Sequence, residues 1–528
     1  MQSRGRVSPK VQLTRFLVAL LFISLVGGIG FSVSAQDSPD VAIYVNSSEI
    51  MIFWDPSDGF SNEIVAMHNM YETLLRYDPF SDSFTPLLAE SYEQSEDGLT
   101  WTFQLRKGVK FHTGNEMDAQ AVKFSFERTM QRGLGASFIW ASVDRIEAVD
   151  DYTVRFHLSF PAPLDLVVAA AYAAYVFDPA FSDHDWFAAG NDSGTGPYTV
   201  QRWSLGEQIE LVLKKFDGYW QGWQGEHFET VVFQVVSEPS TRRLMIERGE
   251  ADFTNRLPVT DIDALRTNPK IEIIETTAWQ NLLSLFNTQK PPLNNKLVRQ
   301  ALAYTIPYDD IVEGALQGFG RQSRGIIPFS LWGYSERVKQ YTHNLEVAKR
   351  LLTAAGFPNG GFKIVLTYVA GDELERKVAE LWKSELAKLN IELEPRGMPW
   401  EAQWDLGKSP NPLRRQDIFL FYWWPDYANP HSFMQAMFAS EDEILFNLSY
   451  YSNSIYDDLI SAAERSAGLD RDQAIELYAD SQNILMEDAP GVALVDIKYQ
   501  RAKRESLSGY VDNPAYAHVV FFYDTFRG

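Results

Sequence analysis

Residues 422–433, YWWPDYANPHSF, concentrate side-chain types that bind small molecules. The carboxylate of Asp426 could accept a charge-assisted hydrogen bond from an ammonium group, which contributes about 1.5–3 kcal/mol in a site sheltered from water. The ring of Trp423 or Trp424 could add a stacking or cation–π contact of about 0.5–2 kcal/mol. The same composition also suits a catalytic corner, or a packed bend in which Asp426 only caps the turn at residues 427–430.

Two further tryptophans are candidates for the same surface. Trp54 follows the first strand signal of the chain, and Trp279 lies in an apolar segment. Aromatic residues make up 14% of the chain, more than a core needs, so some are expected to line a concave binding surface. Sugar rings also stack on tryptophan, and each of these two residues fits the core equally well.

Motifs that indicate catalysis are missing from the sequence. It contains no HExxH, no GxSxG, no P-loop and no GxGxxG between a strand and a helix, and its 8 histidines show no metal-ligand spacing. Paired acids such as Asp55/Asp58 and Asp183/Asp185 are expected by chance among 70 acidic residues. We therefore predict no enzymatic activity, no metal and no cofactor. A secreted glycoside hydrolase, whose fold would bring two carboxylates together, remains the alternative.

Bulk composition narrows the class of protein. The length of 528 residues suggests two to four domains or lobes. A net charge of −23 argues against a nucleic-acid partner and fits a soluble monomer. The absence of cysteine excludes disulfides, thiolate chemistry, cysteine-ligated zinc and a lipid anchor on an N-terminal cysteine.

Residues 1–35 have the pattern of a secretory signal peptide. Four basic residues precede an apolar run at 16–31, and the sequence SVSA then supplies small residues for cleavage before Gln36. The alternative is an uncleaved anchor helix, although the run is shorter than the roughly 20 residues that span a bilayer. We predict an exported, periplasmic or extracytoplasmic protein.

Strand and helix patterns alternate along the rest of the chain and must position these groups. Residues 99–105 alternate apolar and polar types, as in a half-buried strand, and Asp118 then caps a helix. Helical patterns at 240–249 and 373–389 each precede another strand. This alternation predicts α/β lobes with mixed sheets, and the Gly/Asp/Ser-rich residues 191–196 are the best candidate for a crossing between lobes.

Five stretches together resemble one family. They are residues 72–114, 194–220 (beginning GTGPY), 286–306 (FNTQKPPLNNKLVRQALAYTI), 348–357 (AKRLLTAAGF) and the stretch at 422–433. In this order they are similar to the extracellular solute-binding proteins, family 5, of ABC importers, the group that binds dipeptides, oligopeptides and nickel. The resemblance covers nearly all of the chain after residue 35.

The resemblance implies a two-lobe, periplasmic-binding-protein-like α/β fold with an extra inserted domain (cluster C type), whose lobes close over a ligand about a hinge. Carried onto this chain, lobe I takes residues 36–78, 194–274 and 496–528, the inserted domain takes 79–193, and lobe II takes 275–495. The hinge crossings would lie near Thr276 and Asp496.

The resemblance also implies a function. The chain would capture a peptide or peptide-like solute and deliver it to an ABC permease and ATPase complex. Asp426 would meet the α-amino group, with Trp424, Trp423, Trp279 and Trp54 as aromatic contacts. Some oligopeptide binders have an arginine shortly before the tryptophan for the ligand carboxylate, but residues 417–424 read DIFLFYWW and contain none. An oligosaccharide or a nickel complex therefore remains an alternative ligand, and a sensor for a signalling partner an alternative role.

Overall fold

The computed structural model describes residues 40–48, 50–205 and 209–528, so the predicted signal peptide lies outside the described residues. In this part of the chain an 11-stranded sheet has the order β15-β14-β16-β12-β17-β11-β1-β10-β9-β8, with β13 paired to β17. Its strands are β1 Val41–Asn46, β8 Tyr198–Leu205, β9 Ile209–Lys215, β10 Thr230–Val235, β11 Phe253–Thr254, β12 Ile271–Phe286, β13 Gly320–Gln322, β14 Lys363–Val369, β15 Glu392–Met398, β16 Ile418–Trp423 and β17 Gly491–Arg504. β1 and β14 pair in parallel with both of their neighbours and the other pairs are antiparallel, so the sheet is mixed as predicted.

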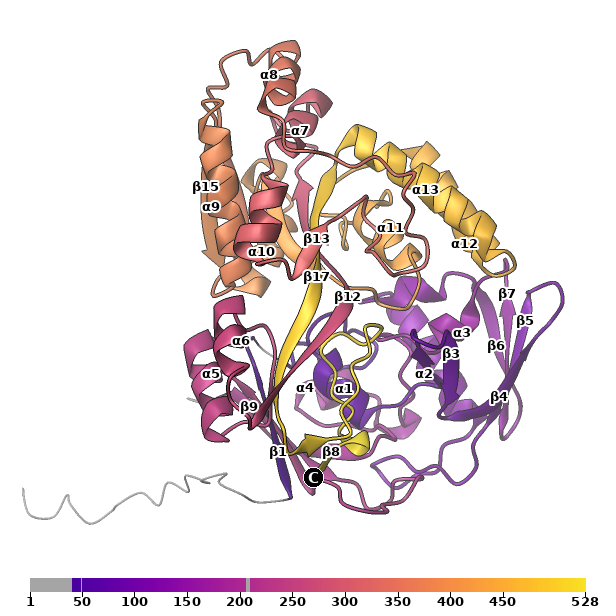
Figure 1. The fold of residues 1–528 in the computed structure, drawn as a ribbon. Coiled ribbons are helices and arrows are strands. Elements are labelled where there is room, and N and C mark those ends of the chain that lie inside the picture. The colour runs from indigo at the N-terminus through magenta and orange to yellow at the C-terminus, as the bar shows by residue number, and fades with distance from the viewer. Residues whose placement is uncertain (1–39, 49, 206–208) are drawn as a thin grey trace, which may run out of the picture. The chain divides into compact units, whose positions relative to one another are not determined.

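Two long strands, β12 and β17, run side by side and join the two halves of this sheet (Figure 1). β12 also pairs with β16 on one side, while β17 also pairs with β11 towards the other half. Their register shifts between Thr277 and Asn281, and Thr276 faces Tyr499 while Asn281 faces Asp496. The two predicted crossings, near Thr276 and Asp496, are therefore neighbours on paired strands.

A separate 4-stranded sheet of order β4-β5-β7-β6 lies within residues 79–193, among the described residues. Its strands are β4 Ala89–Gln94, β5 Thr100–Leu105, β6 Val143–Asp150 and β7 Thr153–Leu158. The alternation predicted for β5 is confirmed in part: Trp101, Phe103 and Leu105 are buried and Gln104 is exposed, but Thr102 on the polar face is also buried. The predicted helix cap is also confirmed, because the Asp118 carboxylate accepts a hydrogen bond from the Ala121 N–H at 2.8 Å. Short pairs of strands are β2 Leu75–Asp78 with β3 Ser83–Pro86, and β18 Leu507–Ser508 with β19 Phe526–Arg527.

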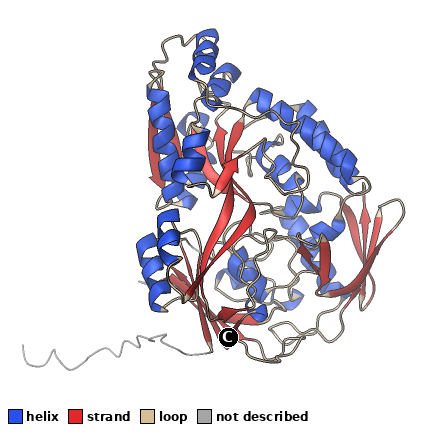
Figure 2. Ribbon diagram, in the orientation of Figure 1, coloured by secondary structure: helices blue, strands red, loops and turns tan. Residues whose placement is uncertain are grey.

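Helices surround these sheets (Figure 2). Those predicted at 240–249 and 373–389 are confirmed: the first ends at Gly249 in the left-handed conformation, and the second is followed by β15. The helices are α1 Ile64–Met70, α2 Ala119–Arg132, α3 Leu164–Val167, α4 His184–Ala188, α5 Pro239–Arg248, α6 Val259–Leu265, α7 Lys296–Ala303, α8 Leu345–Ala354, α9 Glu373–Ala387, α10 Trp400–Gly407, α11 His431–Phe438, α12 Ser454–Ala467 and α13 Arg471–Asp488. Short 3-10 turns lie at Ser137–Trp140, Pro179–Phe181, Pro412–Arg414 and Phe522–Asp524, and a π-helical turn at Asp310–Ala315.

The glycines of the GTGPY segment press against the end of α1. A Cβ on Gly194 would lie 2.1 Å from the Met70 carbonyl oxygen, and one on Gly196 would lie 2.6 Å from the Met70 carbonyl carbon. The Gly196 N–H donates to that same oxygen at 2.9 Å. Only glycine allows so close an approach of two backbone segments, which is the physical reason for this motif.

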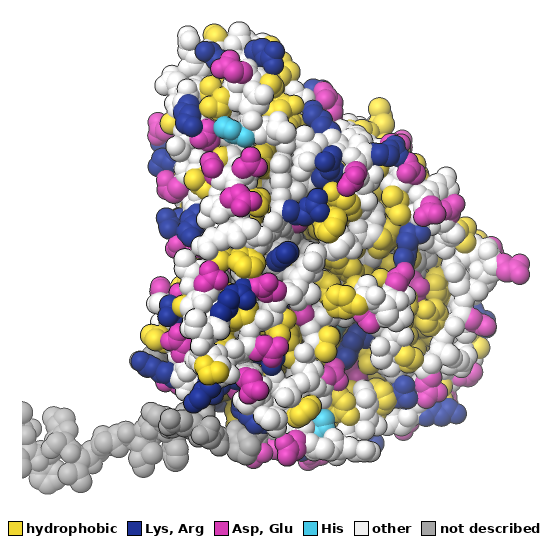
Figure 3. Space-filling view, viewed as in Figure 1, with side chains coloured by type: hydrophobic (Ala, Val, Ile, Leu, Met, Phe, Trp, Pro, Cys, Tyr) yellow, Lys and Arg dark blue, Asp and Glu magenta, His cyan; other side chains and the backbone are white. Residues whose placement is uncertain are grey.

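Two observations concern the surface of the described residues. No helix among them is long and apolar enough to cross a membrane. Acidic and basic side chains are interspersed over the face shown in Figure 3, where neither charge forms a continuous band.

Candidate functional site

Two neighbouring cavities meet where the loops after β11, β14 and β16 converge. They share the lining residues Ser48, Arg256, Val369 and Tyr422. The smaller, of about 70 Å³, is here called the aromatic cavity and is lined by Ser48, Phe60, Ser61, Asn62, Arg256, Val369, Glu375, Trp400, Phe421, Tyr422, Trp423, Trp424 and Asp426. The larger, of about 170 Å³, is here called the polar cavity, and its lining includes Arg242, Asn255, Gln280, Asp372, Lys377, Lys498, Tyr499, Arg501 and His518. Pockets at the ends of sheet strands are common ligand sites in α/β folds.

The strand β16 delivers the two predicted tryptophans to the aromatic cavity. Trp423, its last residue, pairs with Asn281 of β12 and is buried. Its indole N–H has no hydrogen-bond partner among the described residues. Trp424 is half-buried and donates its indole N–H to the Tyr172 hydroxyl at 3.0 Å. Both tryptophans therefore line one cavity. Contact of either ring with a ligand stays a prediction.

Asp426 lies in the same cavity wall with only 2% of its surface exposed. Its carboxylate accepts a hydrogen bond from the Ser432 hydroxyl at 2.7 Å, and that hydroxyl oxygen accepts the Asp426 backbone N–H at 2.8 Å. Burial raises the pKa of the Asp426 carboxyl to about 7. No hydrogen bond joins this carboxylate to a backbone N–H of residues 427–430 among the described residues, so capping of that turn does not account for it.

The loop that carries Asp426 is anchored from behind by Glu464 of α12. Tyr427 and Tyr478 donate their hydroxyls to this carboxylate at 3.2 Å, and the Asn429 side-chain amide donates at 3.0 Å. His431 of the same loop is also buried, with Nδ1 3.1 Å from the Tyr427 hydroxyl, and its burial lowers its pKa.

The sequence reasoning missed two acids, Glu375 in the wall of the aromatic cavity and Asp372 in the wall of the polar cavity. Glu375, in the first turn of α9, is fully buried; its Oε2 accepts the Val369 N–H at 2.6 Å, and its Oε1 has no partner among the described residues. Asp372 caps α9 through the Glu375 N–H at 2.9 Å and accepts the Tyr422 hydroxyl at 3.1 Å. Burial, and then the charge of Asp372, raise the pKa of Glu375 well above its usual value. The capping pattern GDELE at 371–375 was the available signal.

Arg256 was also missed, and it lines both cavities. It is the second residue after β11 and has a φ of 50°, in the left-handed region. Its guanidinium carbon lies 5.9 Å from the ring centroid of Tyr422 and 5.6 Å from that of Trp424. Nothing in the local sequence ADFTNRLP distinguishes this arginine from a surface residue.

The other two predicted tryptophans are not among the residues that line the two cavities. Trp54 is buried edge-on against Trp203, with ring centroids 4.9 Å apart. Trp279 is buried with its ring centroid 6.4 Å from that of Tyr77. Neither lines the aromatic or the polar cavity, so both have the surroundings of core residues, and ligand contact by them stays a prediction.

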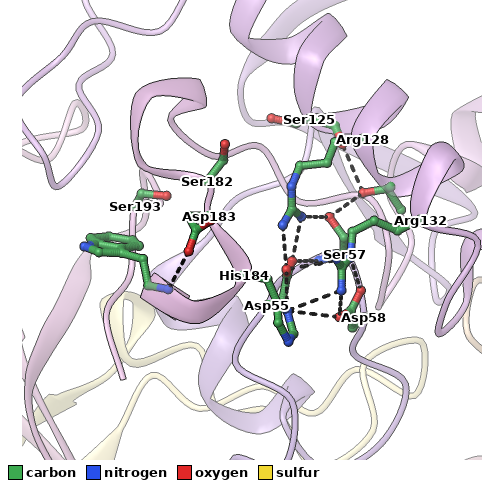
Figure 4. Close-up of polar contacts among 12 residues, drawn as sticks. Asp55, Ser57, Asp58, Ser125, Arg128, Arg132, Ser182, Asp183, His184 and Ser193 are labelled. Atoms are coloured by element: carbon green, nitrogen blue, oxygen red, sulfur yellow. Dashed lines mark hydrogen bonds and ion pairs between the residues drawn. The ribbon is translucent and has the colours of Figure 1, made fainter. Parts of the chain in front are cut away.

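Asp55, Asp58 and His184 form the one group of described residues with the geometry to hold a metal ion, their donor atoms lying within 4.8 Å of one another. Two guanidinium groups already occupy its carboxylates (Figure 4). Arg128 donates to both oxygens of Asp55 at 2.7 and 2.6 Å, and Arg132 donates through Nε to Asp58 at 2.6 Å. A divalent cation would have to displace both arginines, so the arrangement is that of an ion-pair cluster that ties this segment to α2.

Comparison with known proteins gives consistent results. The model of the family "Bacterial extracellular solute-binding proteins, family 5 Middle" matches residues 83–443. The probable D,D-dipeptide-binding periplasmic protein DdpA of Escherichia coli K12 is 31% identical over 471 residues, 87% of this chain and 89% of that protein. Heme-binding protein A of Haemophilus influenzae is 28% identical over 488 residues, 87% and 86% of the two chains. The structure of the ABC transporter-associated periplasmic binding protein DppA of Helicobacter pylori in complex with peptide STSA superposes with a TM-score of 0.82 at 27% identity, over 92% of this chain and 98% of that one.

Proposed function

The chain belongs to the bacterial extracellular solute-binding proteins, family 5, the two-lobe α/β binding proteins of ABC importers, and from this premise we propose that its solute is a peptide or peptide-like molecule with a free amino group. The observation that carries the proposal is the buried Asp426 in a cavity walled by Tyr422, Trp423 and Trp424. Among the described residues, no cationic side chain forms an ion pair with this carboxylate.

An ammonium group in the aromatic cavity would complete this site. It would donate to Asp426 and lie against the indole faces, gaining both a charge-assisted hydrogen bond and a cation–π contact. The DdpA, DppA and heme-binding relatives are named for peptide or heme ligands, which supports a solute of this size class. A solute without an amino group would leave a buried carboxyl unpaired, which is unfavourable.

We propose lobe boundaries at 36–78, 194–274 and 496–528 for lobe I and 275–495 for lobe II, with residues 79–193 as the inserted domain. The pairing of β12 with β17 at Thr276 and Asp496 supports a double-stranded hinge there. Ligand would favour the closed arrangement of the lobes, which the ABC permease and its ATPase would recognise. The protein would act outside the cytoplasmic membrane once residues 1–35 are removed, and would perform no chemistry on its solute.

A thermal-shift screen of residues 36–528 tests this proposal. The panel contains short peptides, their N-acetylated forms, oligosaccharides and nickel–histidine complexes. A ligand at 100 times its Kd stabilises by about 2.7 kcal/mol, so a true ligand is readily detected. We expect peptides with a free amino group to raise the Tm and N-acetylated peptides to have no effect.

The matched variants are Asp426→Asn and, as a control, Asp144→Asn, which removes an exposed carboxylate of β6. We expect only Asp426→Asn to abolish the shift. A shift caused by an oligosaccharide or a nickel complex that survives Asp426→Asn would refute a peptide-like solute. Turnover of any panel compound would instead support the hydrolase alternative.

A further inference from the structure

We propose that Arg256 binds the carboxylate of the solute, which is therefore a zwitterion with its amino group at Asp426 and its carboxylate at the junction of the two cavities; this inference rests on the proposed function. Arg256 is one of the residues that the cavities share, and Asp426 belongs to the aromatic cavity alone. The two come from segments that are distant in sequence, after β11 and after β16. A zwitterion held by both groups would bridge the two proposed lobes.

The guanidinium of Arg256 is available for such a ligand. Among the described residues it forms no ion pair with a carboxylate, and its side-chain hydrogen bond is the weak one that Nε donates to His518 Nε2 at 3.4 Å. Burial, and then the nearby positive charge of Arg256, lower the pKa of His518 well below its usual value, so the imidazole is neutral and accepts this bond. Both terminal nitrogens therefore remain free to meet a carboxylate in the bidentate geometry that arginine favours.

Neutralising the acids already present is the competing role for Arg256, and the contacts argue against it. Asp372 uses its Oδ1 for the Glu375 N–H and the Tyr422 hydroxyl. Glu375 is bonded to the Val369 N–H and is deeply buried. Neither acid approaches Arg256 within ion-pair distance among the described residues, so the positive charge at the junction is not paired.

The backbone at Arg256 is held in an unfavourable conformation. A φ of 50° lies in the left-handed region, which is uncommon for a side chain of this size and is energetically unfavourable. Arg242, buried in the wall of the polar cavity, fixes it by donating to the Arg256 carbonyl at 2.9 Å and to the Val236 carbonyl at 2.7 Å. Strain that the surroundings enforce at a cavity wall is typical of residues that must present a group to a ligand.

Polar groups beyond Arg256 suit the acidic end of such a solute. Gln280 Nε2 and Arg501 Nε, both from buried residues lining the polar cavity, have no hydrogen-bond partner among the described residues. Lys498 contributes to the same lining. Asp426 and Glu375 line the aromatic cavity, where Arg256 is the one basic residue among the described lining residues. The polar cavity adds Arg242, Lys377, Lys498 and Arg501 to its acids Asp372 and Glu373, so basic groups predominate on the side proposed for the solute carboxylate.

The test uses random libraries of di- to tetrapeptides in three forms: free, N-acetylated and C-amidated. Residues 36–528 are incubated with each library, retained peptides are identified by native mass spectrometry, and their affinities are measured by calorimetry. We expect wild-type protein to bind free peptides about 10- to 100-fold more tightly than the same peptides as C-amides, the value of a charge-assisted bond to arginine. This comparison needs no variant and so does not depend on whether a variant folds.

Arg256→Gln should lose this 10- to 100-fold preference by weakening only the free peptides, while Arg256→Lys should retain part of it. Arg145→Gln, which removes an exposed arginine of β6, is the matched control and should leave both affinities unchanged. Equal affinity of wild-type protein for free and amidated peptides would overturn the role of Arg256 and leave the proposed function standing. Failure of every library, or equal binding of N-acetylated peptides, would overturn the proposed function and this inference together.

Discussion

Binding of a free-amine peptide should weaken as the pH falls from 7 to 5, because the Asp426 carboxyl must lose a proton before it can pair with an ammonium. Its pKa in the unliganded protein is raised to about 7 from a usual value of 3.8. Below pH 7 the unliganded carboxyl is mostly protonated, and ligand binding then has to release that proton. The ligand's own ammonium and carboxylate do not change charge in this range, since their pKa values are about 8 and about 3.5.

The size of the effect follows from linkage. Each pH unit below the raised pKa weakens the apparent affinity by about tenfold, equivalent to about 1.4 kcal/mol. Because the carboxyl is already about half protonated at pH 7, the dissociation constant should rise by about 50-fold between pH 7 and pH 5. The raised pKa also affects folding. Because the folded protein binds the Asp426 proton more tightly than the unfolded chain does, this proton stabilises the fold fully below about pH 4, and the stabilisation is lost as the pH rises towards 7.

Calorimetric titrations at pH 5, 6 and 7, in buffers of different ionisation enthalpy, measure both quantities. We expect release of nearly one proton per peptide at pH 5 and about half a proton at pH 7. Any residual binding to Asp426→Asn, measured at high peptide concentration, should show no pH dependence, whereas Asp144→Asn should keep it. Glu375 and Arg256 line the same cavity as Asp426, and Glu375 could titrate in the same range. The variant Glu375→Gln is therefore included to distinguish protonation of Glu375 from protonation of Asp426. An affinity that is flat between pH 5 and 7, or the same slope in Asp426→Asn, would refute the reasoning.

Two further predictions concern stability. Gly194→Ala should lower the free energy of unfolding by about 3 kcal/mol in urea titrations, because the new Cβ would lie 2.1 Å from the Met70 carbonyl oxygen. The control Gly314→Ala, whose Cβ would have no atom within 4 Å, should have little effect. Equal losses in the two variants would contradict this reasoning. Arg128→Ala should lower the free energy of unfolding by about 3 kcal/mol, because the buried Asp55 carboxylate, whose side chain is 1% exposed, would lose its principal partner. An unchanged urea midpoint would contradict this and show that Arg132 alone neutralises Asp55.

The sequence predicted the two-lobe α/β fold and the family, and both are confirmed. Local patterns sufficed for this because they act over a few residues: the Asp118 cap and the glycine that ends α5 are as predicted, and the apolar face of β5 is buried as predicted. The composition of residues 422–433 also pointed to a segment that lies at a cavity, since Trp423, Trp424 and Asp426 all line the aromatic cavity.

Other features depended on contacts between distant segments, which no local pattern contains. Trp54 and Trp279 are tryptophans in aromatic surroundings like Trp423, but both are packed in the core and neither lines the aromatic or the polar cavity. The paired acids Asp55 and Asp58 read as a chance pair, and α2 supplies two arginines that make them an ion-pair cluster.

The sequence by itself determined the fold class, the family and the acidic, aromatic nature of the loop after β16, because periodicity, caps and family motifs are properties of contiguous residues. Only the tertiary structure decided which charges share the site. Arg256 lies 170 residues before Asp426 and is brought to the same junction by β11, β12 and β17, whose pairing spans the whole sheet. No arginine just before the tryptophans marks this site in the sequence, because a binding site is defined by proximity in space and not by order along the chain.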